Sequence, residues 1–153
     1  MNRPISTRTH GMIDYAWATT AGALTAMMSG ATATVHLVRQ AGTVAGLNAM
    51  MTNYEAGIVR VLPMKGHLAI DFVMNSTLIM SPFFLPRSER RYAAVPVLLG
   101  VVGFLATIFT ETESPQERVA GFTPSRELSE AVADPDVTRT FHHRSHYPSS
   151  ISL

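Results

Sequence analysis

Apolar residues gather in four long stretches that short polar segments separate, at residues 11–29, 34–53, 67–85 and 92–110. The fourth stretch holds no charged residue, and the first and third each hold one acidic residue close to their start. None shows the stripe of charged positions that a soluble amphipathic helix turns toward water. About 20 predominantly apolar residues suffice to cross a bilayer as a helix. The pattern therefore predicts an all-α fold of four transmembrane helices.

Two other interpretations fit the pattern less well. A soluble four-helix bundle would carry charged residues on the outer face of every helix. A cleaved signal peptide would use Arg3 and Arg8 as its basic segment and Ala31-Thr32-Ala33 as its cleavage site. Asp14, however, interrupts the apolar run early. We expect the first stretch to remain in the folded protein as a helix.

An internal repeat relates the two halves of the apolar region. When the sequence slides on itself without a gap until His10 falls on His67, Asp14 falls on Asp71. The second helices follow in the same register, with Val44 on Val101, Gly46 on Gly103 and Ala49 on Ala106. Each unit is a two-helix hairpin, at about residues 10–53 and 67–110. Because two spans return the chain to its starting side, the units are predicted to be parallel repeats around a pseudo-twofold axis along the membrane normal.

Composition divides the chain into an apolar body and a polar tail. Residues 1–110 carry eight Lys and Arg against four acids, whereas residues 111–153 carry four arginines against seven acids. The expected domains are a transmembrane domain at 1–110 and an extended polar tail at 111–153. Cysteine is absent, which excludes disulfides, cysteine nucleophiles and thiolate metal sites. The sequence has no phosphate loop, nucleotide fingerprint or nucleophile–base pattern, so it favours a non-catalytic role without a nucleic-acid partner.

The two His–Asp pairs are the candidate functional residues. His10 and Asp14, and likewise His67 and Asp71, stand four positions apart, so each carboxylate can reach the imidazole on its own helix face. The simplest interpretation is structural, because the helix dipole favours an aspartate in the first turn; the pairs could also join across the pseudo-twofold as an interhelical lock. Proton handling by paired dyads and a haem or metal site formed by His10 and His67 stay open as alternatives. No cofactor is predicted.

Small residues at a spacing of four predict where helix backbones approach closely. They are Gly42 and Gly46 on the second predicted helix, and Ala18, Gly22 and Ala26 on the first. In lipid, such residues allow close packing of helices. We expect packing within the chain, with packing against a partner subunit as the alternative.

Two proline steps, Ser81-Pro82-Phe83 and Leu85-Pro86, close the third apolar stretch. Proline lacks a backbone donor and its ring clashes with the preceding turn. We expect both steps to end the third helix sharply.

Several short motifs resemble the SPW-repeat family of small bacterial integral membrane proteins. They are Thr9-His10-Gly11 with Asp14-Tyr15, Asn53-Tyr54-Glu55, Arg60-Val61-Leu62-Pro63-Met64 before His67, and Ser81-Pro82-Phe83. In that family each repeat has two transmembrane helices, and the first carries a Ser-Pro-Trp motif near its end. Here Phe83 replaces the tryptophan, and the first repeat has Leu24-Thr25-Ala26 instead. The resemblance covers residues 5–110, leaves the tail unmatched, and implies an architecture rather than an activity.

These observations lead to one expected function and one alternative. We expect a non-catalytic, multi-pass protein of the bacterial inner membrane, which is a structural or accessory subunit of a larger complex. It would contact lipids and other membrane subunits through its helices and tail. The alternative is an autonomous small transporter or proton-handling protein that uses the His–Asp dyads. Cytoplasmic termini are favoured by a narrow margin of five basic residues against four: Arg3, Arg8, Arg60, Lys65 and Arg118 against Arg39, Arg87, Arg90 and Arg91.

Overall fold

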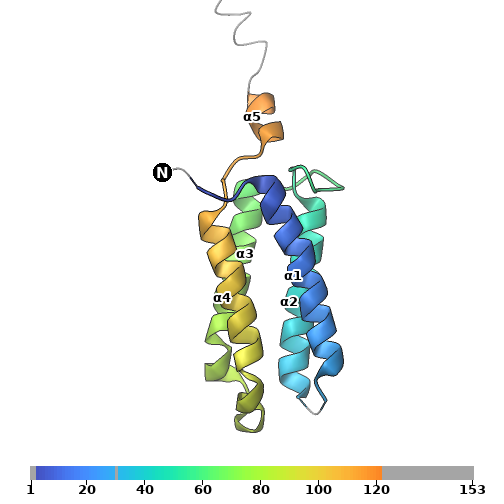
Figure 1. The fold of residues 1–153 in the computed structure, drawn as a ribbon, viewed down its shortest axis with the longest axis vertical. Helices are drawn as coiled ribbons and strands as arrows, with labels where there is room; N and C mark the ends of the chain where they lie inside the picture. Colours follow the sequence, from blue (N-terminus) through green and yellow to red (C-terminus); the bar gives the residue numbers. More distant parts are fainter. Residues whose placement is uncertain (1–2, 30, 122–153) are drawn as a thin grey trace, which may run out of the picture. The chain divides into compact units, whose positions relative to one another are not determined.

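Four long helices coincide with the four apolar stretches. The computed structural model describes residues 3–29 and 31–121. Its α-helices are α1 (Thr7–Met27), α2 (Thr32–Met51), α3 (Met64–Phe84), α4 (Ala94–Phe109) and the short α5 (Pro115–Gly121), and a 3₁₀ helix, η1 (Arg87–Tyr92), precedes α4. The described residues are mostly helical and contain no strand, which confirms the predicted all-α class (Figure 1).

The apolarity of these helices falls short of the prediction. In the described part of the chain, none of them combines the length and the mean hydropathy required to cross a membrane. The four-span architecture therefore stays a prediction.

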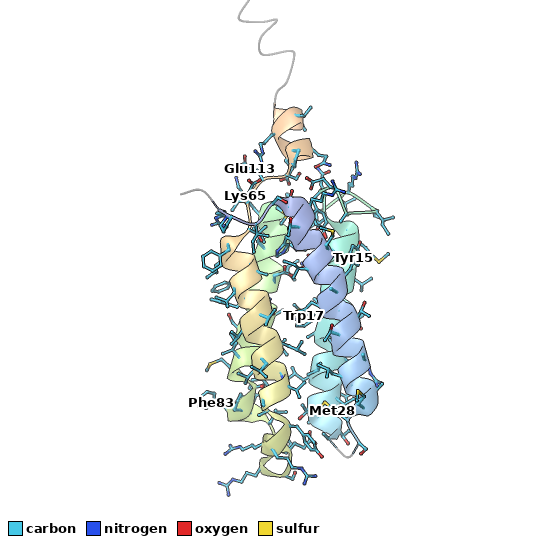
Figure 2. The ribbon with its side chains drawn as sticks, in the orientation of Figure 1. Tyr15, Trp17, Met28, Lys65, Phe83 and Glu113 are labelled. Carbon is cyan, nitrogen blue, oxygen red and sulfur yellow. The ribbon has the colours of Figure 1, made fainter. Side chains whose placement is uncertain are left out.

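The helices pack as two hairpins. α1 lies against α2 and α3 lies against α4, whereas the contacts of α1 with α4 and of α2 with α3 are less extensive (Figure 1). An apolar cluster that includes Trp17, Val38, Leu78 and Leu99 joins the two hairpins. The indole Nε1 of Trp17, which lies between the hairpins in Figure 2, donates a hydrogen bond of 2.9 Å to the carbonyl oxygen of Leu99. This side chain thus links α1 directly to α4.

Two similar bridges connect the helical segments at the end of the bundle near the N-terminus. Ile5 pairs with Thr110 in a parallel bridge, and Leu62 pairs with Thr52 in the same way. Ile5 and Leu62 have the same separation in the chain as His10 and His67, whereas Thr52 and Thr110 are further apart by a single position. The first helices of the hairpins, α1 and α3, therefore match at one separation in the chain, and the second helices, α2 and α4, match at a separation that is one residue longer.

Burial supports the same change of register. The buried positions Val38, Ala41, Gly42, Ala45 and Asn48 of α2 recur, at the separation of Thr52 and Thr110, as Pro96, Leu99, Gly100, Gly103 and Ala106 of α4. The predicted uniform register, in which Gly46 matches Gly103, is thus wrong by one residue in the second helices. The connection between α3 and α4 is correspondingly longer than the connection between α1 and α2.

α3 continues past the first of its two proline steps. Pro82 lies inside the helix, which ends at Phe84. Pro82 cannot donate to the preceding turn, but the backbone N–H of Leu85 donates to the carbonyl oxygen of Ser81 at 2.9 Å. The prediction that Ser81-Pro82-Phe83 ends the helix is therefore wrong. The Leu85-Pro86 step ends it, because a residue before proline favours extended backbone, which Leu85 adopts.

Glu89 of η1 caps the N-terminus of α2. The residue before α2 is Ala31, whose side chain cannot cap. The Glu89 carboxylate accepts hydrogen bonds from the backbone N–H groups of Ala33 at 3.1 Å and Thr34 at 2.8 Å, and from the Thr34 hydroxyl at 2.9 Å. The hydrogen bond from the Thr34 N–H, with the others, holds the pKa of Glu89 below its usual range.

Part of the predicted tail, residues 115–121, forms the short helix α5. At the start of α5, the Ser114 hydroxyl accepts from the Glu117 N–H at 3.2 Å, and the Glu117 carboxylate accepts from the Ser114 N–H at 2.9 Å. The same carboxylate caps α3 by accepting from the Met64 N–H at 2.7 Å. Lys65 and Glu113 form an exposed ion pair of 2.7 Å at this end of α3 (Figure 2). The rest of the predicted tail, residues 122–153, lies outside the described residues.

Candidate functional site

Four buried side chains from α1 and α3 meet near one end of the bundle. They are His10 and Asp14 of α1 and His67 and Asp71 of α3, with exposed fractions of 1, 8, 0 and 3%. The spacing of four residues places each pair on one helix face, and the two repeats turn these faces toward each other. We call these four residues the tetrad. The two predicted dyads are therefore joined as an interhelical lock.

Contacts within the tetrad run between the hairpins as well as within them. The Nε2 atoms of His10 and His67 lie 3.1 Å apart. Asp71 Oδ2 lies 3.2 Å from His10 Nε2 and 3.0 Å from His67 Nε2. Asp14 Oδ2 lies 3.1 Å from His67 Nε2, and Asp14 Oδ1 lies 3.5 Å from His10 Nε2. Each carboxylate thus faces both imidazole rings, and both rings turn Nε2 toward the centre.

A threonine holds the outer nitrogen of each histidine. Thr52 Oγ1 lies 2.8 Å from His67 Nδ1, and Thr110 Oγ1 lies 2.8 Å from His10 Nδ1. Each hydroxyl donates its own proton to the backbone carbonyl four residues earlier, at 2.6 Å. The hydroxyl can therefore only accept from the ring, so Nδ1 carries a proton in both histidines. In a neutral ring, Nε2 then has a lone pair directed at the centre of the tetrad.

The two carboxylates of the tetrad differ in their support. The side-chain amide of Asn48 donates to Asp71 Oδ1 at 2.9 Å and to the carbonyl oxygen of His67 at 3.2 Å. The matching residue of α4 is Ala106, whose side chain has no donor. Asp14 Oδ2 is buried and accepts no hydrogen bond. A buried anionic oxygen without a donor is costly, so Asp14 needs a nearby positive charge or a proton.

Tyr54, from the connection between α2 and α3, covers the tetrad. Its side chain is fully buried, and its ring centroid lies 5.7 Å from that of His67. The ring lies against Gly11, where an added Cβ would come within 2.8 Å of Tyr54 Cζ. Burial raises the pKa of Tyr54 well above its usual range, so the phenol stays protonated at neutral pH.

The small residues predicted to line helix contacts divide into two groups. An added Cβ on Gly42 would lie 3.4 Å from the carbonyl oxygen of Ala18, and one on Gly46 would lie 3.8 Å from the Ala18 Cβ. α1 and α2 therefore approach closely at these three positions. Gly22 and Ala26 are exposed instead, and an added Cβ on Gly22 would meet nothing within 4 Å.

A haem between His10 and His67 does not fit the tetrad. Their Nε2 atoms are 3.1 Å apart, which leaves no space for a macrocycle between the rings. The small pocket beside Asp14, Asp71 and Asn75 has a volume of about 10 Å³. A void of this size holds about one water molecule at most. The geometry thus accommodates a shared proton or a single metal ion.

The sequence indicates the four residues of the tetrad but not the side chains that support them. Thr52 and Thr110 occupy equivalent positions after the two second helices, but the uniform register aligns Thr52 with Phe109 and so hides this equivalence. Asn48 was visible as an isolated amide in an apolar stretch. Tyr54 gave no signal for a role at the tetrad, because its position depends on how the connection packs.

Comparison with known proteins identifies no relative: no family model, no curated protein and no solved structure matches the chain. The resemblance to the SPW-repeat family therefore rests on the quoted motifs alone and stays a prediction.

Proposed function

We propose that this chain is a non-catalytic protein of the bacterial inner membrane and an accessory subunit of a larger complex. Its helices α1–α4 would cross the bilayer as two parallel hairpins. The observation that carries the proposal is the inverted polarity of the bundle. Large apolar side chains are exposed on the outer faces of the helices, among them Leu47, Val73, Met80, Phe83, Leu98, Val102 and Leu105; Phe83 points away from the bundle in Figure 2. Polar and charged side chains are buried inside it, among them Asn48, Asn75 and the tetrad.

A lipid environment accounts for this inversion. Soluble monomers rarely expose contiguous apolar patches larger than about a few hundred Å², whereas in lipid the ionisable side chains face the interior of the bundle. Charges also gather toward the helix ends, with Arg8 and Lys65 in first turns and three arginines in η1. Arg39 is the one exposed charge in the helix bodies of α1–α4, and its long side chain can extend toward lipid headgroups.

Two apolar grooves support the accessory role. One has a volume of about 550 Å³ and lies between α2 and α3; the other has about 490 Å³ and lies between α1 and α4. The pseudo-twofold relates their linings, with Ile13 matching Ile70 and Thr20 matching Thr77. Grooves of this kind accept large apolar side chains from a neighbouring transmembrane helix. The exposed Gly22 would let such a helix approach the backbone of α1.

Membrane insertion and topology can be tested with single cysteines, because the chain has none of its own. Ser88→Cys in η1 and Glu113→Cys at the opposite end of the bundle are both exposed positions. In spheroplasts, an impermeant thiol reagent should label Ser88→Cys and should label Glu113→Cys only after lysis. The protein should also stay in the membrane pellet after an alkaline carbonate wash. Equal labelling of both positions before lysis, or release by carbonate, would contradict the proposal.

The accessory role is tested by purification from native membranes in mild detergent. We expect larger subunits to co-purify in fixed stoichiometry. Thr20→Trp and Thr77→Trp fill one groove each and should lower this co-purification, whereas Met80→Trp, exposed on α3 outside either groove, should not. A wild-type chain that elutes alone as a compact monomer would refute the accessory role.

A second candidate function, proton handling, is favoured by the contacts within the tetrad. The two imidazoles lie 3.1 Å apart and contact both carboxylates at 3.0–3.5 Å, so protons can be exchanged along these contacts. In proteoliposomes, the combined change Asp14→Asn and Asp71→Asn should then abolish proton flux while the helix content stays unchanged. The same flux in wild-type and variant vesicles would exclude this function.

A further inference from the structure

We propose that the tetrad is a four-coordinate site for a divalent first-row transition metal, with zinc as the ion that fits best. His10, Asp14, His67 and Asp71 each offer one ligand atom, and these atoms all lie within 4.8 Å of one another. All four side chains are buried. The inference does not depend on where the bundle resides.

The spacing of the ligand atoms fits a tetrahedral site. Zinc binds imidazole nitrogen and carboxylate oxygen at about 2.0–2.2 Å, which places neighbouring ligand atoms of a tetrahedron about 3.3–3.6 Å apart. The contacts between histidine nitrogens and carboxylate oxygens in the tetrad measure 3.0–3.5 Å, and the two Nε2 atoms are 3.1 Å apart. Because the four ligand atoms, one from each residue, span up to 4.8 Å, an ion at the centre requires the closest pairs to move slightly apart and the most distant pair to move closer.

The side chains that hydrogen-bond to His10, His67 and Asp71 prepare these ligands for a metal. A metal-binding histidine usually donates its other N–H to a fixed acceptor, which sets the tautomer. Thr52 and Thr110 are such acceptors for His67 and His10, and in the neutral rings they leave the Nε2 lone pair free to bind an ion. Asn48 occupies Asp71 Oδ1, so the other oxygen of that carboxylate remains for the ion.

The charge balance also calls for a divalent cation. Metal binding requires ionised carboxylates and neutral imidazoles, and in that state the four ligands would carry two negative charges in a buried site. Among the residues that the structure describes, Asp14 and Asp71 form ion-pair contacts only with the two histidines, and no lysine or arginine pairs with them. A divalent ion would neutralise the site and would bind Asp14 Oδ2, which accepts no hydrogen bond.

The two imidazole nitrogens and two carboxylate oxygens indicate which class of ion would bind and what role it would have. Calcium and magnesium prefer six or more oxygen ligands, whereas imidazole nitrogen favours zinc and its neighbours. Because protein side chains fill all four positions, no coordination site is left for a substrate, which is typical of structural rather than catalytic zinc. The ion would fasten α1 of the first hairpin to α3 of the second.

The test uses the full chain, purified in detergent, stripped with a chelator and titrated with Zn²⁺ or Co²⁺. We expect one ion per chain and, with Co²⁺, the intense visible bands of tetrahedral coordination. Asp71→Asn should lose both, whereas Glu113→Gln, which changes an exposed carboxylate near the same end of α3, should keep both. Stripped wild-type protein that takes up no ion, or Asp71→Asn that binds like wild type, would overturn the proposal.

A second variant keeps the test decisive if Asp71→Asn does not fold. Thr52→Val removes the acceptor of the His67 Nδ1–H, together with the hydroxyl's hydrogen bond to the Asn48 carbonyl, and leaves all four ligands in place. Loss of a residue that hydrogen-bonds to a metal ligand weakens metal binding by about 10- to 100-fold. We therefore expect Thr52→Val to bind one Zn²⁺ per chain with an affinity lowered by this factor, and an unchanged affinity would refute the assigned coordination.

Discussion

The Nε2 atoms of His10 and His67 lie 3.1 Å apart, although the two histidines belong to different repeats of the chain. Each ring is held from outside by the opposite hairpin, since Thr110 contacts His10 and Thr52 contacts His67. The two hairpins therefore exchange contacts at the tetrad, and neither can form its half of the site alone. This interlocking makes the tetrad the main polar link between the repeats.

The contact between Gly11 and Tyr54 predicts a destabilising substitution. In Gly11→Ala, the new Cβ would overlap the buried Tyr54 ring and the Ala56 Cβ. Overpacking of this kind costs about 1–3 kcal/mol. Gly22→Ala is the matched control, because nothing lies within 4 Å of an added Cβ there, and alanine stabilises a helix by about 0.5–1 kcal/mol relative to glycine. Unfolding followed by circular dichroism measures both, and a loss of stability in Gly22→Ala equal to that in Gly11→Ala would contradict the assigned packing.

Replacing Thr110 tests the support of His10. Thr110→Val leaves the buried Nδ1–H of His10 without an acceptor, and an unsatisfied buried donor costs about 1–3 kcal/mol. Thr43→Val provides the control, because the exposed Thr43 hydroxyl donates only to the Arg39 carbonyl of its own helix; such surface changes stay within about 0.5 kcal/mol. Denaturant titration of both variants gives the comparison. Equal free energies of unfolding for the two would show that the Thr110 hydroxyl does not hold the histidine.

The Glu89 cap predicts a pH dependence of stability. Because its pKa in the folded protein lies below the ordinary value of 4.5, Glu89 stabilises the fold fully above pH 4.5. That contribution is lost as the pH falls from 4.5 through the lowered pKa, since the protonated carboxyl caps less well. Glu89→Gln lacks this titration. Wild type should therefore unfold at higher temperature than Glu89→Gln near neutral pH, and the difference should shrink in acid; a difference that stays constant with pH would disprove the charged cap.

The helices and the tetrad were predictable from the sequence for physical reasons. Long apolar runs without charged stripes need a helical, protected backbone, and the four runs became α1–α4 with ends shifted by only a few residues. Ionisable residues are rare in such runs, so His10 and Asp14, repeated as His67 and Asp71, stood out against their surroundings.

The remaining features depend on contacts between distant segments. A slip of one residue between α2 and α4 leaves an apolar pattern almost unchanged, so the true register appeared only with the Thr52 and Thr110 contacts. Glu89 caps a helix that begins far earlier in the chain, beyond the whole of α3, and no local pattern marks such a cap. The rule that a proline ends a helix fails at Pro82, because the N–H of Leu85 closes one more helical turn beyond it.

The most direct test of the tetrad is X-ray absorption at the zinc edge of the zinc-loaded, full-length protein. Four nitrogen and oxygen ligands at about 2.0–2.1 Å, with the outer-shell scattering of two imidazole rings, are the expected result. This pattern would place one ion between His10 and His67 and join the two hairpins through it. Six-coordinate zinc, or scattering from fewer than two imidazoles, would contradict the site.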